Sequence, residues 1–71
     1  MIVRDSVAST NVASVGYDEA TETLEVEFQN GTIYQYFNVG SGLYQQFLAS
    51  PSKGQFLNAY IRRAFPYSRV G

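Results

Sequence analysis

The sequence predicts an α+β fold, a three-stranded antiparallel β-meander with two C-terminal helices packed on one face. Residues 12–37 alternate apolar and polar side chains with period two and are interrupted by turn residues. Residues 41–65 instead place apolar side chains at helical spacing. Because the chain has 71 residues, we expect one domain, at residues 11–71.

The first ten residues are expected to form a loose N-terminal arm. They are mostly small and polar and show no apolar period. Residues 1–10 would be anchored only if Ile2 and Val3 dock on the domain.

The first two strands are expected on either side of the turn "DEATET". In the second strand, "TLEVEF", apolar residues alternate with two glutamates, which is typical of a strand with one covered face and one wet face. A four-residue loop that sets Asp18 opposite Thr23 would bring Val15 opposite Val26. The apolar side chains of both strands would then share one face.

The third strand, "TIYQYF", fits two registers that turn its tyrosines to opposite faces, because a shift of one residue exchanges the faces of a strand. If Asn30 and Gly31 alone form the turn, Tyr34 and Tyr36 lie outside beside the glutamates and Gln35 is buried. If a three-residue loop ends in Gly31 as a bulge, the tyrosines join the core.

The second register is favoured, because it keeps every charge and amide of the hairpin outside. It sets Tyr34 opposite Val26, and a tyrosine can bury its ring while its hydroxyl stays at a wet rim. Tyr36 joins the same core. Ile33 and Phe37 are then expected to be exposed.

Two helices are expected after residue 40. Ser41 is the expected N-cap of the first, and Pro51 stops it. The second begins at Ser52, whose spacing to Gln55 matches a capping box, and it ends before Pro66. The expected apolar face of this helix is Phe56, Leu57, Tyr60, Ile61 and Ala64.

The charges divide along the chain. All six acidic residues precede residue 28, while four of the five basic residues follow residue 52. A folded domain of this kind has a basic part that can attract an anionic partner whatever the net charge. Asp18, Glu19 and Glu22 lack the ligand pattern of a calcium loop, so we expect a solvated turn and no metal.

Other features exclude whole classes of protein. The chain has no histidine and no cysteine, and no motif activates a serine beside Lys53, so we expect no catalytic residues and no cofactor. No apolar run resembles a signal peptide or approaches the roughly 20 residues of a membrane span. We expect a soluble, cytoplasmic protein that does not bind membranes.

Several stretches resemble the KTSC domain, namely "SVGYD", "LEVEF", "NG", "YQYF" and "SPSKGQFLNAYIRRAFPYSRV". The resemblance covers roughly residues 9–70. The family takes its name from its occurrence at the C-terminus of some lysyl-tRNA synthetases, and it also forms stand-alone bacterial or phage proteins. Its motif residues in this chain are Tyr34, Tyr36, Ser52, Lys53, Gly54, Pro66 and Tyr67. We interpret Tyr34, Tyr36, Ser52, Gly54 and Pro66 as structural.

The resemblance implies a role in RNA binding, because the domain is fused to an enzyme that handles tRNA. The residues agree, since Lys53, Arg62, Arg63 and Arg69 are interleaved with aromatic residues, as in surfaces that combine phosphate contacts with base stacking. We therefore expect tRNA or single-stranded RNA as the partner, with Tyr67 available for stacking. Alternatively, the arginines only complement the helix dipole or pair with glutamates across the fold.

The other expected function is binding to a protein or to a second copy of the chain. A three-stranded meander leaves its outer strands, 12–17 and 32–37, with unpaired edges that invite strand addition. Ile33 and Phe37 would contribute to an apolar patch on the open face.

Overall fold

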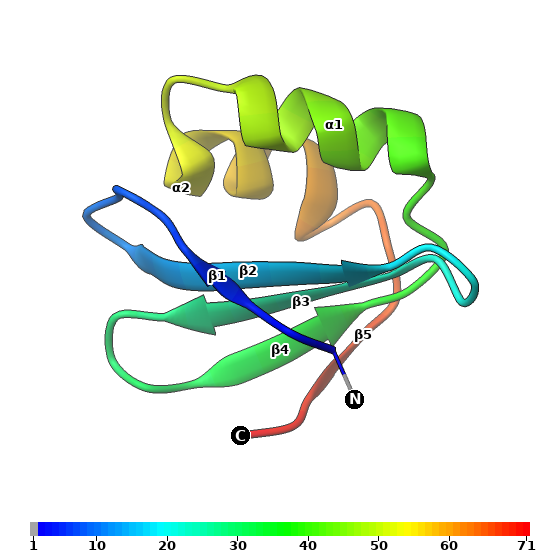
Figure 1. Cartoon of the computed structure of the whole chain (residues 1–71), viewed down its shortest axis with the longest axis horizontal. Coiled ribbons are helices and arrows are strands. Elements are labelled where there is room, and N and C mark those ends of the chain that lie inside the picture. Colours follow the sequence, from blue (N-terminus) through cyan, green and yellow to red (C-terminus); the bar gives the residue numbers. More distant parts are fainter. Residues whose placement is uncertain (1) are drawn as a thin grey trace.

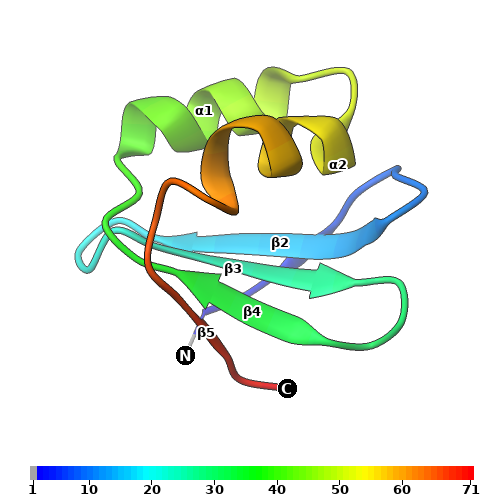
Figure 2. The same ribbon diagram turned by 180° about the vertical axis from the view of Figure 1, so that it is seen from behind.

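The computed structural model describes residues 2–71, so Met1 of the expected arm lies outside the described residues. One antiparallel sheet with strand order β1-β2-β3-β4-β5 carries the helical segments on one of its faces (Figures 1 and 2). The strands are β1 (Asp5–Ser6), β2 (Val12–Asp18), β3 (Thr23–Phe28), β4 (Ile33–Tyr36) and β5 (Tyr67–Arg69). The helical segments are α1 (Ser41–Ala49), α2 (Lys53–Phe56) and the π-helical η1 (Leu57–Ile61).

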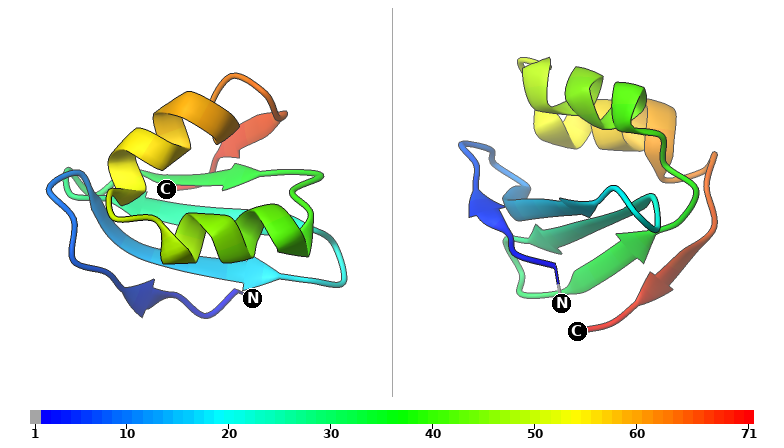
Figure 3. Two further views of the ribbon diagram at one scale, coloured as in Figure 1. Left: turned by 90° about the horizontal axis from the view of Figure 1, so that it is seen from above. Right: turned by 45° about the vertical axis from the view of Figure 1, so that its right-hand side comes forward.

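The α+β class and the central meander are confirmed, and so is the favoured register. Asp18 pairs with Thr23, and Val26 pairs with Tyr34. The loop after β3 places Gly31 at φ 89°, in the left-handed region that glycine adopts without strain. The core therefore forms between the β2–β4 meander and the helices above it (Figure 3). It consists of Val12, Val15, Leu24, Val26, Tyr36, Val39, Phe47, Leu57 and Ile61.

The expectation of open edges on the meander is wrong. β1 pairs with β2 on one side, and β5 pairs with β4 on the other. Ile33 and Phe37 are half-buried rather than exposed, because the end of the chain returns along them. The Phe37 amide donates to the Pro66 carbonyl at 2.8 Å, and the Val70 amide donates to the Ile33 carbonyl at 2.8 Å.

Residues 2–4, which precede β1, lie against the face of the sheet opposite the helices, and we call this segment the N-terminal strap. The strap lies close to Gly16, where a Cβ atom would lie 2.6 Å from Ile2 Cγ2 and would collide with the Val3 carbonyl oxygen. The absence of a side chain at Gly16 thus lets the strap lie against β2. As a result, the face of the glutamates is not fully wet: Glu25 is only 8% exposed.

The helices begin and end differently from the sequence expectation at two points. Gly40, not Ser41, is the N-cap of α1, and it makes no side-chain capping bond. The Ser52 cap of α2 is confirmed, since its hydroxyl accepts from the Gln55 amide at 3.3 Å. η1 ends at Ile61, and Tyr60 lies outside the core with 59% of its surface exposed.

Tyr60 is exposed because α2 and η1 contribute only a narrow stripe of side chains to the core. Leu57 and Ile61 fill it, whereas Tyr60 packs on Phe56 at the outer flank, with ring centroids 4.8 Å apart. Ala64, also expected on the apolar face, is exposed in the turn beyond η1. Within the described residues, no helix has the length and hydropathy needed to cross a membrane.

Candidate functional site

A groove of about 1270 Å³ lies between η1 and the end of the sheet formed by the β3–β4 hairpin and β5. We call it the tyrosine–arginine groove. Its lining consists of Thr10, Asn11, Phe28, Gln29, Asn30, Thr32, Tyr34, Tyr36, Asn58, Ala59, Arg62, Arg63, Tyr67 and Arg69. Segments far apart in the sequence therefore build one site.

Three tyrosines form the floor of the groove. Tyr36 pairs with Tyr67, and Tyr34 pairs with Arg69, so their side chains share the face of the sheet that carries the helices. The ring centroids of Tyr67 lie 5.8 Å from Tyr34 and 6.0 Å from Tyr36. Phe28 meets Tyr34 edge to face at 5.8 Å. The cluster runs from the buried ring of Tyr36 to that of Tyr67, which is 59% exposed.

Three arginines supply the positive charge of the groove. Arg62 and Arg63 follow η1, Arg69 comes from β5, and all three are exposed. Arg62 Nη1 donates to Asn58 Oδ1 at 2.9 Å, and Arg69 Nε donates to the main-chain oxygen of Gly71 at 2.9 Å. Within residues 2–71, no aspartate or glutamate lines the groove, and none of these arginines forms an ion pair with an acidic side chain. Their charges are therefore available to an anionic ligand.

The surroundings of Tyr36 change the pKa of its hydroxyl group. Burial raises the pKa of Tyr36, and the nearby positive charge of Arg62 opposes part of that rise. The hydroxyl therefore remains protonated at neutral pH and can donate a hydrogen bond into the groove that its side chain lines.

Lys53 does not belong to the groove. Its Nζ donates to the Ser50 carbonyl at 2.8 Å, between the two helices, and its side chain is half-buried. The structure thus brings four of the five predicted nucleic-acid contacts together and separates one. The four are Arg62, Arg63, Tyr67 and Arg69.

The remaining motif residues have structural positions. Ser52 caps α2. Gly54 is buried where a Cβ would lie 3.1 Å from Asn11 Nδ2, so any larger residue there would require the Asn11 side chain to shift. The carbonyl of Pro66 accepts from the Phe37 amide and directs the chain into β5.

Tyr34 and Tyr36 have a position that sequence reasoning did not foresee. They face inward as expected, but the helices cover only Tyr36, and both line the groove. The reason is β5, which adds Tyr67 and Arg69 beside them on the same face. The Tyr-x-Tyr motif is thus part of the core and of the candidate site at once.

The amide side chains of the groove were also missed. Asn11, Gln29 and Asn30 come from loops, where such residues are usually explained by turn formation. Asn58 stands four residues before Arg62, a spacing that places two side chains together on a helix, and this was the one signal available.

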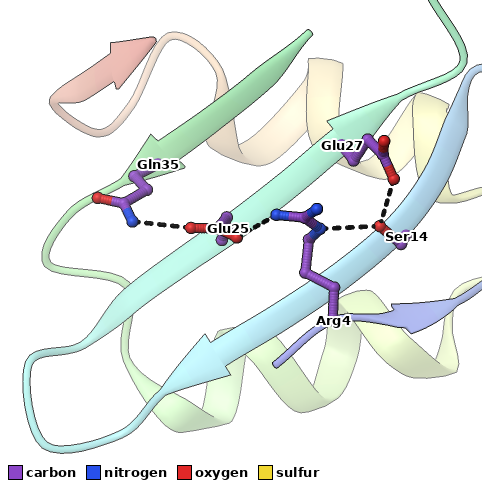
Figure 4. A network of polar contacts seen from close by, with 5 residues as sticks. All are labelled: Arg4, Ser14, Glu25, Glu27 and Gln35. Carbon is purple, nitrogen blue, oxygen red and sulfur yellow. Dashed lines mark hydrogen bonds and ion pairs between the residues drawn. The ribbon is translucent and has the colours of Figure 1, made fainter. Parts of the chain in front are cut away.

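The glutamates of β3 are held on the other face of the sheet (Figure 4). Glu25 pairs with Arg4 of the strap and accepts from Gln35 Nε2 at 2.8 Å. Arg4 Nε donates to Ser14 Oγ at 3.0 Å, and Ser14 Oγ donates to Glu27 at 2.9 Å. The alternative in which C-terminal arginines pair with these glutamates is therefore wrong, because the sheet separates them.

The acidic turn between β2 and β3 shows the solvated arrangement that its sequence predicts. Asp18 Oδ1 accepts from the Ala20 amide at 3.0 Å and closes a local turn. In the part of the chain that the structure describes, no three acidic, histidine or cysteine side chains are grouped as metal ligands would be.

Comparison with known proteins identifies the domain. The model of the KTSC domain family matches residues 8–65. The crystal structure of a KTSC domain protein from Yersinia pestis superposes with a TM-score of 0.93 at 33% identity, over the whole of both chains. A protein from Stutzerimonas stutzeri is 36% identical over 68 residues, which cover 94% of this chain and 96% of the relative.

Longer relatives contain the same domain. A lysine–tRNA ligase from Nostoc punctiforme is 32% identical over 59 residues, 83% of this chain, and the matching region is C-terminal in such ligases. The chain spans about a tenth of the length of this relative. The match to the family model and the matches over nearly the full length of small relatives together show that the chain belongs to the KTSC domain family.

Proposed function

We propose that this domain is a non-catalytic binding module that holds single-stranded RNA in the tyrosine–arginine groove. One observation carries the proposal: the groove combines three arginines that have no acidic side chain as a partner with three clustered tyrosines. Guanidinium groups pair with phosphates, and aromatic rings stack with bases whatever their sequence.

The geometry favours a single strand over a duplex. The floor of the groove is aromatic, and only the outermost ring, Tyr67, is mostly exposed. A base must leave its own stack to reach such a ring, which unpaired nucleotides do at little cost. The ligand is therefore a single-stranded RNA segment, including the unpaired segments of a tRNA.

The relatives give independent support for an RNA ligand. Three of them are named lysine–tRNA ligases, from Nostoc punctiforme, Trichormus variabilis and a Nostoc strain, and they are 32–37% identical to this chain. A proposal that this domain contacts tRNA in such proteins agrees with a groove that is positive and aromatic.

Strand addition by a protein partner was suggested by unpaired edges on the outer strands of the meander, and the structure does not have those open edges. β2 and β4 each have a neighbouring strand on both sides. The outermost strands, β1 and β5, contain two and three residues, a short template for another chain. Light scattering that gives a stable dimer would nevertheless support self-association instead.

The test is a titration of labelled single-stranded RNA and tRNA, followed by fluorescence anisotropy. The double variant Arg62→Glu/Arg63→Glu reverses two charges at the groove, and we expect at least a tenfold loss of affinity. The matched control is Lys53→Gln, because Lys53 lies outside the groove. Unchanged binding by the double variant, or no binding by the parent chain, would remove the proposal.

A further inference from the structure

We infer that the groove takes a short segment of RNA, about two to four nucleotides long, and stacks a single base of that segment on Tyr67. The inference rests on the proposed function and assigns the size of the ligand and the number of bases that it presents to the protein. Three features of the groove carry it: its length along the sheet, its number of arginines and the exposure of its aromatic rings.

The length of the groove follows one strand. Thr32, Tyr34 and Tyr36 all line it, so its floor runs along alternate residues of β4 from the residue before that strand to its last residue. Four steps of about 3.3 Å along a strand give this floor a length of about 13 Å. One strand of a DNA duplex advances about 3.4 Å per nucleotide, and an unstacked strand extends to roughly twice that. The floor therefore accommodates about two to four nucleotides.

The arginines give an independent measure of the same length. Arg62, Arg63 and Arg69 are the basic side chains among the described residues that line the groove. If each guanidinium group pairs with one phosphate, the groove engages three phosphates, and three phosphates join four nucleotides. A fifth nucleotide would find no further basic side chain in this lining.

The tyrosines differ in whether a base can reach them. Tyr36 is buried, and the ring of Tyr34 is enclosed by other rings. Phe28 meets Tyr34 edge to face at 5.8 Å, and Tyr36 lies nearly parallel to it at 6.3 Å. Tyr67 also contacts Tyr34 and Tyr36, but it lies on the edge strand β5 and keeps 59% of its surface exposed. One base can therefore stack in the groove, and the other nucleotides are held through their phosphates.

The first experiment measures the affinity of the parent chain for labelled uridine oligomers of increasing length by fluorescence anisotropy. We expect the affinity to stop rising steeply at or before the tetramer. A dodecamer offers about nine positions to a site of four nucleotides, so we expect it to bind no more than about tenfold more tightly than the tetramer. A larger gain would overturn the inference and leave the proposed function standing. Absence of binding by the dodecamer would remove both.

Tetramers with abasic sites test the number of stacked bases. The complete tetramer is compared with a fully abasic one and with four tetramers that each keep one base at a different position. We expect the complete tetramer to bind at least about fivefold more tightly than the abasic one, the smallest effect of one stacked base. We also expect one of the single-base tetramers to bind within about threefold of the complete tetramer. If all four bind more weakly than that, or if the complete and abasic tetramers bind equally, the inference is overturned.

A variant tests the assignment of the stacked base to Tyr67. Tyr67→Leu removes the ring and keeps the arginines, so we expect it to bind the complete and abasic tetramers with affinities within about twofold of each other. Tyr60→Leu, equally exposed but outside the groove, is the control and should keep the difference. Thermal unfolding establishes that each variant is folded. A difference above twofold in Tyr67→Leu would overturn the assignment.

Discussion

The two faces of the sheet differ in whether their arginines are paired with acidic side chains. On the face under the N-terminal strap, Arg4 pairs with Glu25. On the helix face, Arg62, Arg63 and Arg69 gather around three tyrosines without a carboxylate among the lining residues. In the first arrangement Arg4 compensates the charge of Glu25, which would be costly to bury without a partner. The second contributes no comparable pairing energy, and it is the arrangement on which the proposed RNA binding rests.

This contrast gives the charge division of the sequence a structural meaning. The glutamates of β3 point away from the helices, and the acidic turn lies at the end of the β2–β3 hairpin. The C-terminal arginines lie around the groove instead. The acidic and basic residues, which are separated in the sequence, are therefore also separated in the structure. The groove is lined by positive charges although the formal net charge of the chain is −1.

The largest expected effect comes from forcing the strap off the sheet. Gly16→Ala places a methyl group against Ile2 and Val3, and we expect a loss of about 3 kcal/mol in the free energy of unfolding. The measurement is urea unfolding. Gly42→Ala is the matched control, because a Cβ there meets open space on an exposed helix, and it should raise stability by about 0.5 kcal/mol. Equal effects of the two variants would contradict the close approach.

Removing one partner of the strap ion pair should have the next largest effect. Arg4→Met leaves Glu25 mostly buried without its cation, and we expect a loss of about 2 kcal/mol, below the range for fully buried pairs because Arg4 is 27% exposed. For a domain of this size, that corresponds to a fall of roughly 10 °C in Tm.

The double variant Arg4→Met/Glu25→Leu should recover much of this stability, since it removes both charges together. RNA affinity should not change in either variant, because the network lies on the opposite face. A loss of affinity at unchanged folding would show that the two faces are not independent.

On the helix face, Tyr67→Leu should separate binding from folding. The ring is 59% exposed, so we expect a stability change below about 1 kcal/mol, whereas losing a stacked base costs about 1–3 kcal/mol of binding free energy. Calorimetry and anisotropy on the same sample measure the two quantities. Tyr60→Leu, equally exposed but outside the groove, should leave affinity unchanged.

The smallest expected effect is the loss of a helix cap. Ser52→Ala removes the oxygen that accepts from the Gln55 amide and should cost about 1 kcal/mol of stability, as measured by thermal unfolding. Ser41→Ala should cost less, because Ser41 is not the cap of α1. A larger loss at Ser41 than at Ser52 would contradict this assignment.

The central part of the fold was predictable because its signals are local and repeated. Period-two alternation and turn residues located β2, β3 and β4, and burial of the tyrosine rings selected the register. The register was also favoured because it was expected to keep the charged side chains of the hairpin outside, but Glu25 is buried and pairs with Arg4. β1 and β5 were missed because two and three residues are too few to form a pattern.

The same limit applies to the candidate site. Interleaved basic and aromatic residues indicated Arg62, Arg63, Tyr67 and Arg69, and these do converge. Lys53 was included with these residues, yet its Nζ donates to the carbonyl of Ser50, the C-cap of α1, and the side chain does not line the groove. The groove exists because β5 pairs with β4. No local sequence pattern predicts this long-range pairing.

The most direct test of the central claim is the salt dependence of RNA affinity. Three arginines that contact phosphates predict a slope of about −2 when the logarithm of the association constant is plotted against that of salt concentration. Arg63→Gln should reduce the magnitude of that slope by about 0.7, while Lys53→Gln should leave it unchanged. A slope near zero, or an equal reduction by both variants, would contradict the claim that the tyrosine–arginine groove is the RNA-binding site.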